Sequence, residues 1–169
     1  MKTIILTSAL FIFSFVCFGQ TERSANLSQE ALKHEIRVNA AYFIAGLPEI
    51  SYERILSDES GVGISMGAAI DKDIEYTFFL TPFYRFYFGK KRAAGFFVEA
   101  NSNLYAQEIH NDPSDNVMGL GLGFALGGKF MTKGGWVAEL LAGAGRNFLN
   151  TDLIEEGYPR LGVSIGKRF

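Results

Sequence analysis

Cysteine is nearly absent from this chain, whose 169 residues include a single thiol, Cys17, inside the first apolar run. Such a run is typical of a segment removed on export, so we expect the mature protein to have no thiol. Without thiols, neither a disulfide framework nor a cysteine zinc site can form. An excess of one charge is also lacking, since the formal net charge is -2. There is no basic domain of the kind that binds nucleic acid, and no nucleic-acid partner is predicted.

Long apolar runs and histidine are scarce as well. After residue 19, no apolar stretch approaches the ~18 residues that a membrane-spanning helix needs. The 2 histidines, His34 and His110, are far apart, and Asp112 and Asp115 do not follow the EF-hand pattern. A triad of His110, Asp112 and Ser114 would use loop residues that seldom reach a common substrate. We therefore predict no catalytic residue, no cofactor and no metal site.

Glycine and aromatic residues are abundant instead. The chain has 19 glycines, 14% aromatic residues and only 4 prolines, which favours a twisted or curved β-sheet. With 48% hydrophobic and 20% charged residues, the composition is that of a globular or membrane-embedded protein and not of a disordered one. The length accommodates one domain.

Residues 1–19 predict a secretory signal peptide. Lys2 provides the positive start, Ile4–Phe18 the apolar segment, and Gly19 the small residue before a cleavage site at Gln20. An alternative makes Cys17 a lipoprotein acceptor, but residues 14–16 lack the expected leucine and small-residue pattern. We expect residues 20–33 to form a polar periplasmic leader and residues 34–169 to form the folded domain.

From residue 34 onward, apolar side chains recur at every second position, which is the period of a β-strand. The alternation is strongest over 117–130, where leucines oppose glycines that suit the inward face of a curved strand. Eight strands are predicted, at about 35–45, 49–56, 61–71, 76–88, 96–107, 117–130, 135–148 and 158–169. The predicted fold is all-β, an eight-stranded antiparallel up-and-down transmembrane β-barrel, since bacterial single-chain barrels have an even number of strands.

The last predicted strand has one apolar face and finishes on an aromatic residue, as outer-membrane barrel strands commonly do. Pairing with the first strand would remove the unpaired edge that hydrocarbon does not tolerate. We predict that its apolar face is read as an assembly signal by the barrel-assembly machinery. The face consists of Leu161, Val163, Ile165 and Phe169.

The opposite faces of these strands carry charged side chains. The interior of an eight-stranded barrel is only just wide enough for side chains, and isolated charges in a dry interior must be neutralised. We therefore predict a lumen charge network that plugs the barrel, with a gated proton or ion path as the alternative. Its predicted members are Arg37, Glu53, Arg85, Glu99, Lys129, Glu139, Arg160 and Arg168.

Aromatic residues occupy both faces of the fourth predicted strand. On the inward face, Phe79, Phe83 and Tyr87 are expected to fill the space that Gly162 and Gly166 leave across the barrel. On the outward face, aromatic residues flanking a basic turn at 90–92 predict an interfacial girdle, with a hydrophobic hairpin of a soluble barrel as the alternative. The predicted girdle is Tyr84, Phe86, Phe88, Phe96 and Trp136.

Three segments, Ile50-Ser51-Tyr52-Glu53-Arg54, the aromatic run 82–88 and Gly95-Phe96-Phe97-Val98-Glu99, resemble a group of small secreted bacterial outer-membrane β-barrel proteins of unknown function. The resemblance covers 34–169, and the architecture is similar to eight-stranded barrels of the outer-membrane protein A and X type. It implies a fold and a location, and no mechanism.

The predicted function is a structural or envelope-maintaining role in the bacterial outer membrane, without catalysis. Outer-membrane lipid and the barrel-assembly machinery are the expected partners, and the protein is expected to be a monomer. One alternative is a narrow pore or a surface-binding barrel. Another is a soluble secreted barrel with an apolar ligand, which would turn Met118, Leu120 and Leu122 inward.

Overall fold

The computed structural model describes residues 32–70, 76–109 and 112–169. The predicted signal peptide and nearly all of the predicted leader lie outside these residues. No helix in the described part of the chain has the length and apolar character needed to cross a membrane. The elements, in chain order, are β1 (His34–Asn39), α2 (Ala40–Ile44), β2 (Glu49–Ile55), β3 (Ser60–Ala68), β4 (Tyr76–Tyr87), β5 (Gly95–Ile109), β6 (Asp112–Met131), β7 (Trp136–Asn147) and β8 (Gly157–Arg168).

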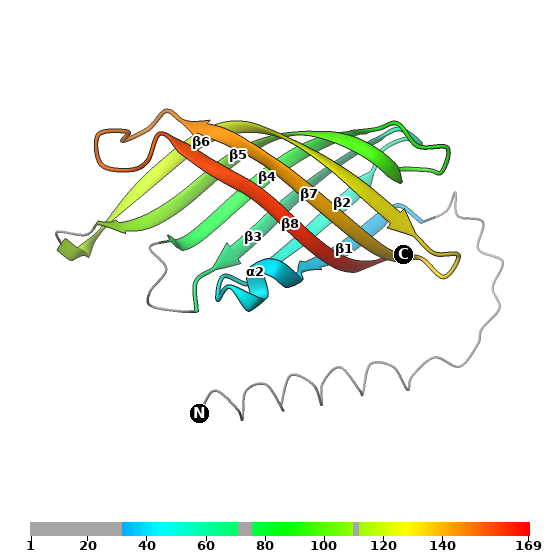
Figure 1. The fold of residues 1–169 in the computed structure, drawn as a ribbon, viewed down its shortest axis with the longest axis horizontal. Coiled ribbons are helices and arrows are strands. Elements are labelled where there is room, and N and C mark those ends of the chain that lie inside the picture. The colour runs from blue at the N-terminus through cyan, green and yellow to red at the C-terminus, as the bar shows by residue number, and fades with distance from the viewer. Residues whose placement is uncertain (1–31, 71–75, 110–111) are drawn as a thin grey trace, which may run out of the picture.

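The eight strands form one closed antiparallel barrel in which each strand pairs with the next along the chain (Figure 1). The barrel closes where β1 pairs with β8, from Glu35 opposite Arg168 to Asn39 opposite Ser164. These pairings confirm the predicted all-β, up-and-down, eight-stranded architecture.

Buried and exposed residues alternate along the strands. Charged residues are buried inside and many apolar residues are exposed outside, which is the reverse of the arrangement in a soluble barrel. In β2, every second residue from Glu49 to Ile55 is buried and the residues between them are exposed. Outward-facing Leu122 and Leu140 are 58% and 56% exposed, whereas inward-facing Glu53 and Arg85 are 0% and 1% exposed. The strand period therefore places most of the apolar side chains on the outside and most of the strand charges on the inside.

The first strand is shorter than predicted. β1 ends at Asn39, and α2 follows where the alternation had predicted strand as far as residue 45. The side-chain oxygen of Asn39 accepts a hydrogen bond from the backbone N–H of Tyr42 at 3.3 Å, which is the interaction of a helix N-cap. Two alanines then begin the helix. The cap and these good helix formers override a weak two-residue period.

Inward-facing rings pack on glycines of the neighbouring strand. A Cβ atom added at any of these glycines would collide with the ring opposite. The predicted packing of β4 rings against Gly162 and Gly166 across the barrel is wrong, because those glycines face Asn39, Leu141 and Arg37. Side chains directly opposite each other on paired strands are close enough to make these ring–glycine contacts. The middle of the barrel, across which the predicted contacts would have to reach, is filled by charged side chains. The pairs are Phe79–Gly67, Phe83–Gly63, Phe97–Gly127, Tyr105–Gly119 and Tyr158–Gly145.

Candidate functional site

The barrel interior holds a set of ten buried charged residues, which we call the lumen network. None of them is more than 4% exposed. Five are carboxylates and five are cations, so the set is formally neutral. All eight of the sequence-predicted lumen residues lie in it. Its members are Glu35, Arg37, Glu49, Glu53, Arg85, Glu99, Lys129, Glu139, Arg160 and Arg168.

Glu53 of β2 lies at the centre of the lumen network. One carboxylate oxygen, Oε2, accepts from Arg37 at 2.6 Å, from Lys129 at 2.8 Å and from Arg85 at 3.0 Å. The other oxygen, Oε1, accepts from the hydroxyl of Tyr87. Because these donors come from β1, β6 and β4, this one carboxylate ties together strands on different sides of the barrel.

Arg85 of β4 connects three carboxylates. Its guanidinium donates two hydrogen bonds to Glu139, at 2.7 and 3.0 Å, and its Nε donates to Glu99 at 2.7 Å. The third carboxylate is Glu53. The guanidinium carbon also lies 4.4 Å from the ring centre of Phe83 and 4.5 Å from that of Phe97. A desolvated guanidinium between two rings adds cation–π attraction to the ion pairs.

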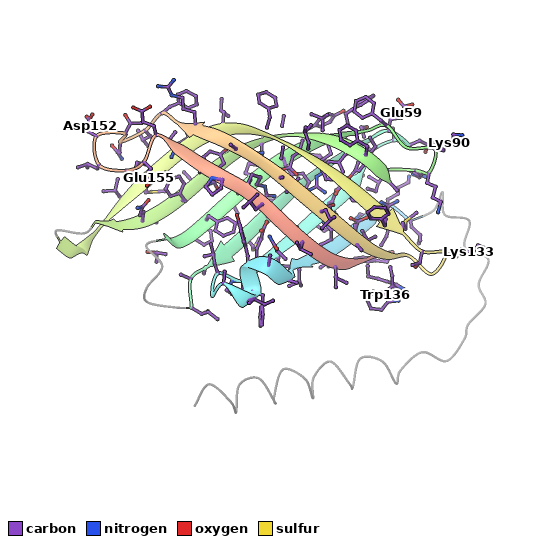
Figure 2. The ribbon with its side chains drawn as sticks, in the orientation of Figure 1. Glu59, Lys90, Lys133, Trp136, Asp152 and Glu155 are labelled. Carbon is purple, nitrogen blue, oxygen red and sulfur yellow. The ribbon has the colours of Figure 1, made fainter. Side chains whose placement is uncertain are left out.

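Arg168 of β8 joins the lumen network to a connection that closes one end of the barrel. It donates to Glu35 at 2.9 Å and to the backbone carbonyls of Arg92 and Ala93 at 2.8 and 2.7 Å. Ala93 and Ala94 are 0% and 2% exposed, so the β4–β5 connection folds into the barrel mouth. Figure 2 shows Lys90, in this connection, at the same end as Glu59 and Lys133.

Arg160 of β8 extends the lumen network toward the opposite end, where Figure 2 shows Asp152 and Glu155. It donates to Glu49 at 2.8 Å and to Glu99 at 3.1 Å. Nearer to that mouth, uncharged polar side chains replace the charged ones among the inward-facing rings. There, Thr81 donates to Asn103 and Tyr158 donates to Asn101, each at 2.8 Å.

Three of the carboxylates approach one another in a way that a metal site would require. Oxygens of Glu35, Glu53 and Glu139 lie within 4.8 Å of one another. The ammonium of Lys129 already lies among them, at 2.8 Å from Glu35 and Glu53 and 3.7 Å from Glu139. Because Lys129, Arg37 and Arg85 already pair with these carboxylates, the arrangement is an ion-pair centre and provides no separate metal site.

A cavity of about 300 Å³ lies between the lumen network and the mouth near α2. Its walls are mainly apolar. Its polar lining groups belong to Thr81, Asn103 and Arg160. The apolar lining residues are Tyr42, Ala45, Leu47, Phe79, Tyr158 and Pro159.

The sequence reasoning missed Glu35 and Glu49 as members of the lumen network. Both have the inward parity, since Glu35 lies two positions before Arg37 and Glu49 four before Glu53. The predicted set also held five cations and only three carboxylates. A dry interior disfavours such an excess of positive charge, so the imbalance was itself a signal of two missing carboxylates.

The predicted outward groups lie at the surface of the barrel. The predicted assembly residues Leu161, Val163, Ile165 and Phe169 are all exposed, as is the predicted girdle. In the girdle, the ring centres of Phe86 and Phe88 are 5.1 Å apart. The Lys167 ammonium lies 5.1 Å from the ring centre of Trp136.

We compared the chain with protein-family models, with curated proteins and with solved structures, and no match was found.

Proposed function

We propose that this protein is a monomeric outer-membrane β-barrel with a structural, envelope-maintaining role and a plugged interior. The observation that carries the proposal is the apolar outward surface. Soluble monomers rarely expose apolar patches larger than a few hundred Å², whereas here every strand contributes exposed apolar side chains. Examples from β1 to β8 are Val38, Ile50, Met66, Phe86, Phe96, Leu122, Leu140 and Val163, each at least 40% exposed.

The exposed aromatic residues support an orientation. Figure 2 shows Trp136 at the barrel end that carries Lys90 and Lys133. At the same end, Phe88 and Phe96 lie on either side of the β4–β5 connection, and Tyr84 and Phe86 lie near the end of β4 before it. Aromatic girdles with adjacent cations are typical of a membrane interface. We assign this end to the periplasmic side, where outer-membrane lipid headgroups and the barrel-assembly machinery would meet the protein.

The neutral, fully buried lumen network favours a structural barrel over a narrow pore. Salt-bridged side chains from seven of the eight strands cross the space through which ions would have to pass. A soluble carrier of an apolar ligand would need an apolar lumen, and the centre of this one is charged.

A matched pair of substitutions tests the membrane location. Leu122 lies midway along β6 and Leu153 lies in the β7–β8 connection, and they are 58% and 59% exposed. In a bilayer, Leu122→Arg is expected to cost roughly 2–4 kcal/mol and Leu153→Arg roughly 0–1 kcal/mol. Urea unfolding of the two variants in phosphatidylcholine vesicles would measure the difference.

Cell fractionation provides the complementary test. The wild-type protein is expected in the outer membrane, with different gel mobility before and after boiling. Recovery from the soluble periplasm, together with equal tolerance of the two arginine substitutions, would contradict the proposed location.

A further inference from the structure

Along one part of β8, the backbone pairing of the barrel wall is interrupted on the side that faces β1. β7 pairs with β8 as far as Arg146 opposite Gly157, but β1 pairs with β8 only as far as Asn39 opposite Ser164. Beyond that pair, α2 takes the place of a strand and packs beside β8 (Figure 1). We call the boundary between α2 and residues 157–163 of β8 the seam.

Side chains, not backbone pairing, hold the seam. The amide nitrogen of Asn39 donates to the carbonyl of Leu161 at 3.1 Å, and the amide oxygen accepts from the N–H of Val163 at 3.2 Å. The N–H of Leu161 donates to the hydroxyl of Tyr42 at 3.4 Å. Pro159 has no N–H that needs a partner. Because two rotatable side chains make these bonds, opening the seam would not require a strand ladder to break.

The cavity near α2 lies along this seam. Its lining takes Tyr42, Ala45 and Leu47 from one side of the seam and Tyr158, Pro159 and Arg160 from the other. The lining residues that are exposed, Ala45 and Pro159, lie on opposite sides of the seam. A lateral opening of the cavity would therefore lie between these two residues.

The lining suits an uncharged molecule with one polar end. Thr81 and Asn103, which hydrogen-bond to each other at 2.8 Å, lie one inward position deeper than Phe79 and form a polar floor. The charge of Arg160 is already matched by Glu49 and Glu99.

The size of the cavity limits the length of such a molecule. A volume of about 300 Å³ is at the lower end of the range for ligand sites. At about 30 Å³ for each water-sized group, it holds a chain of roughly ten non-hydrogen atoms.

We propose that this cavity binds a small neutral amphiphile of the bilayer, of which a medium-chain alcohol is the simplest representative, and that the amphiphile reaches the cavity laterally through the seam. The hydroxyl end lies against Thr81 and Asn103, and the alkyl chain lies between the aromatic walls. This inference rests on the proposed membrane location, because lateral access requires lipid outside the seam.

The test is photolabelling of the full folded chain in phosphatidylcholine vesicles with a decanol that carries a diazirine in its chain. Peptide mass spectrometry is expected to find adducts on cavity residues such as Tyr42, Leu47 and Phe79. An equal concentration of 1-decanol should lower this labelling at least twofold, whereas decyl sulfate should leave it unchanged. Competition by decyl sulfate as strong as that by 1-decanol would overturn the neutral-ligand assignment.

Substitutions of two exposed alanines separate cavity binding from general exposure to lipid. Ala45→Trp fills the cavity opening, and its matched control, Ala100→Trp, adds the same ring to the outward face of β5. Cavity adducts should fall at least tenfold in folded A45W and stay at the wild-type level in A100W. If A45W does not fold, the wild-type adduct map and its competition decide the question.

The adduct map distinguishes the two proposals. Adducts confined to outward residues such as Leu122 and Leu140 would overturn the cavity site and leave the membrane location intact. Recovery of an unlabelled protein in the supernatant, free of vesicles, would contradict the membrane location itself and with it the lateral route.

Discussion

Glu53 shows what a single residue does in this barrel. Its carboxylate accepts hydrogen bonds from three cations and one hydroxyl while being 0% exposed. A buried charge is costly without partners, and without Glu53 the lumen network would hold five cations and only four carboxylates. Substituting a single charged side chain of the lumen network is therefore expected to lower the stability of the barrel, although the network as a whole is neutral.

Replacing Glu53 by glutamine should destabilise the barrel by about 3–5 kcal/mol, because three buried cations lose their shared anion. Glu156→Gln is the matched control, since Glu156 pairs with Arg146 at 3.4 Å with both side chains exposed. The control should change the free energy of unfolding by less than about 0.5 kcal/mol. Urea unfolding in vesicles measures both, and equal effects would contradict the assigned role of Glu53.

Two adjacent glycines of β6 provide a second comparison. A Cβ at Gly127 would collide with the ring of Phe97, whereas at Gly128 the nearest atom, on Phe130, would be 3.9 Å away. We expect Gly127→Ala to cost about 1–3 kcal/mol through overpacking. Gly128→Ala should be neutral or slightly stabilising. Thermal unfolding of the two variants measures this, and a Gly128→Ala effect as large as that of Gly127→Ala would count against ring-on-glycine packing.

At the scale of the elements, β1 and α2 determine where the backbone pairing of the barrel wall is interrupted. β1 pairs with β8 over only five residue pairs, and α2 then diverts the chain away from the ladder. At the same position the Asn39 side chain caps α2 and also supplies the groups that a further backbone pair would have provided. One asparagine therefore ends a strand, begins a helix and maintains the seam.

Asn39→Ala should loosen the seam locally. The variant removes both hydrogen bonds to β8, and each unsatisfied backbone group should cost roughly 1–3 kcal/mol. Amide hydrogen exchange at Val163 is expected to accelerate at least tenfold. Exchange at Ile165, which lies opposite Val38 in the β1–β8 ladder, serves as the internal control and should change much less. Equal acceleration at the two amides would indicate global destabilisation and contradict a local role for Asn39.

At the scale of the whole molecule, the interior is closed in two different ways. The β4–β5 connection seals one mouth through the contacts of Arg168 with Arg92 and Ala93, and the lumen network fills the middle. Toward the other mouth the interior is less dense and contains the cavity, with Ile154 of the β7–β8 connection packed over Phe79 and Tyr105. The end with the β4–β5 connection is thus sealed, and the cavity lies toward the other end.

The closed interior predicts that the full chain shows no steady conductance in planar bilayers. An open outer-membrane porin inserted in the same bilayer is the positive control. The expected reason is that the salt-bridged side chains leave no continuous aqueous path. A stable, salt-dependent current from the wild-type protein would contradict the plug, and Arg85→Ala would then be the first variant with which to locate the path.

The eight-stranded architecture and the direction of nearly every side chain were predictable from the sequence. Alternation between apolar and polar residues is a local property of period two, so it does not depend on how the strands meet. The same parity placed Arg37, Glu53 and Arg85 in the lumen before any contact was known. It failed at residues 40–45, where an N-cap and helix-forming alanines outweighed the alternation.

What the sequence by itself determined is thus which side chains face inward and that their charges must balance. Only the tertiary structure decided that Glu53 forms ion pairs with Arg37, Lys129 and Arg85 together. It also decided that rings pack on glycines of adjacent strands and that α2 leaves a seam beside a cavity. The physical reason is that these contacts join residues far apart in the chain. They depend on the pairing register of all eight strands, and the closure of the barrel sets that register as a whole.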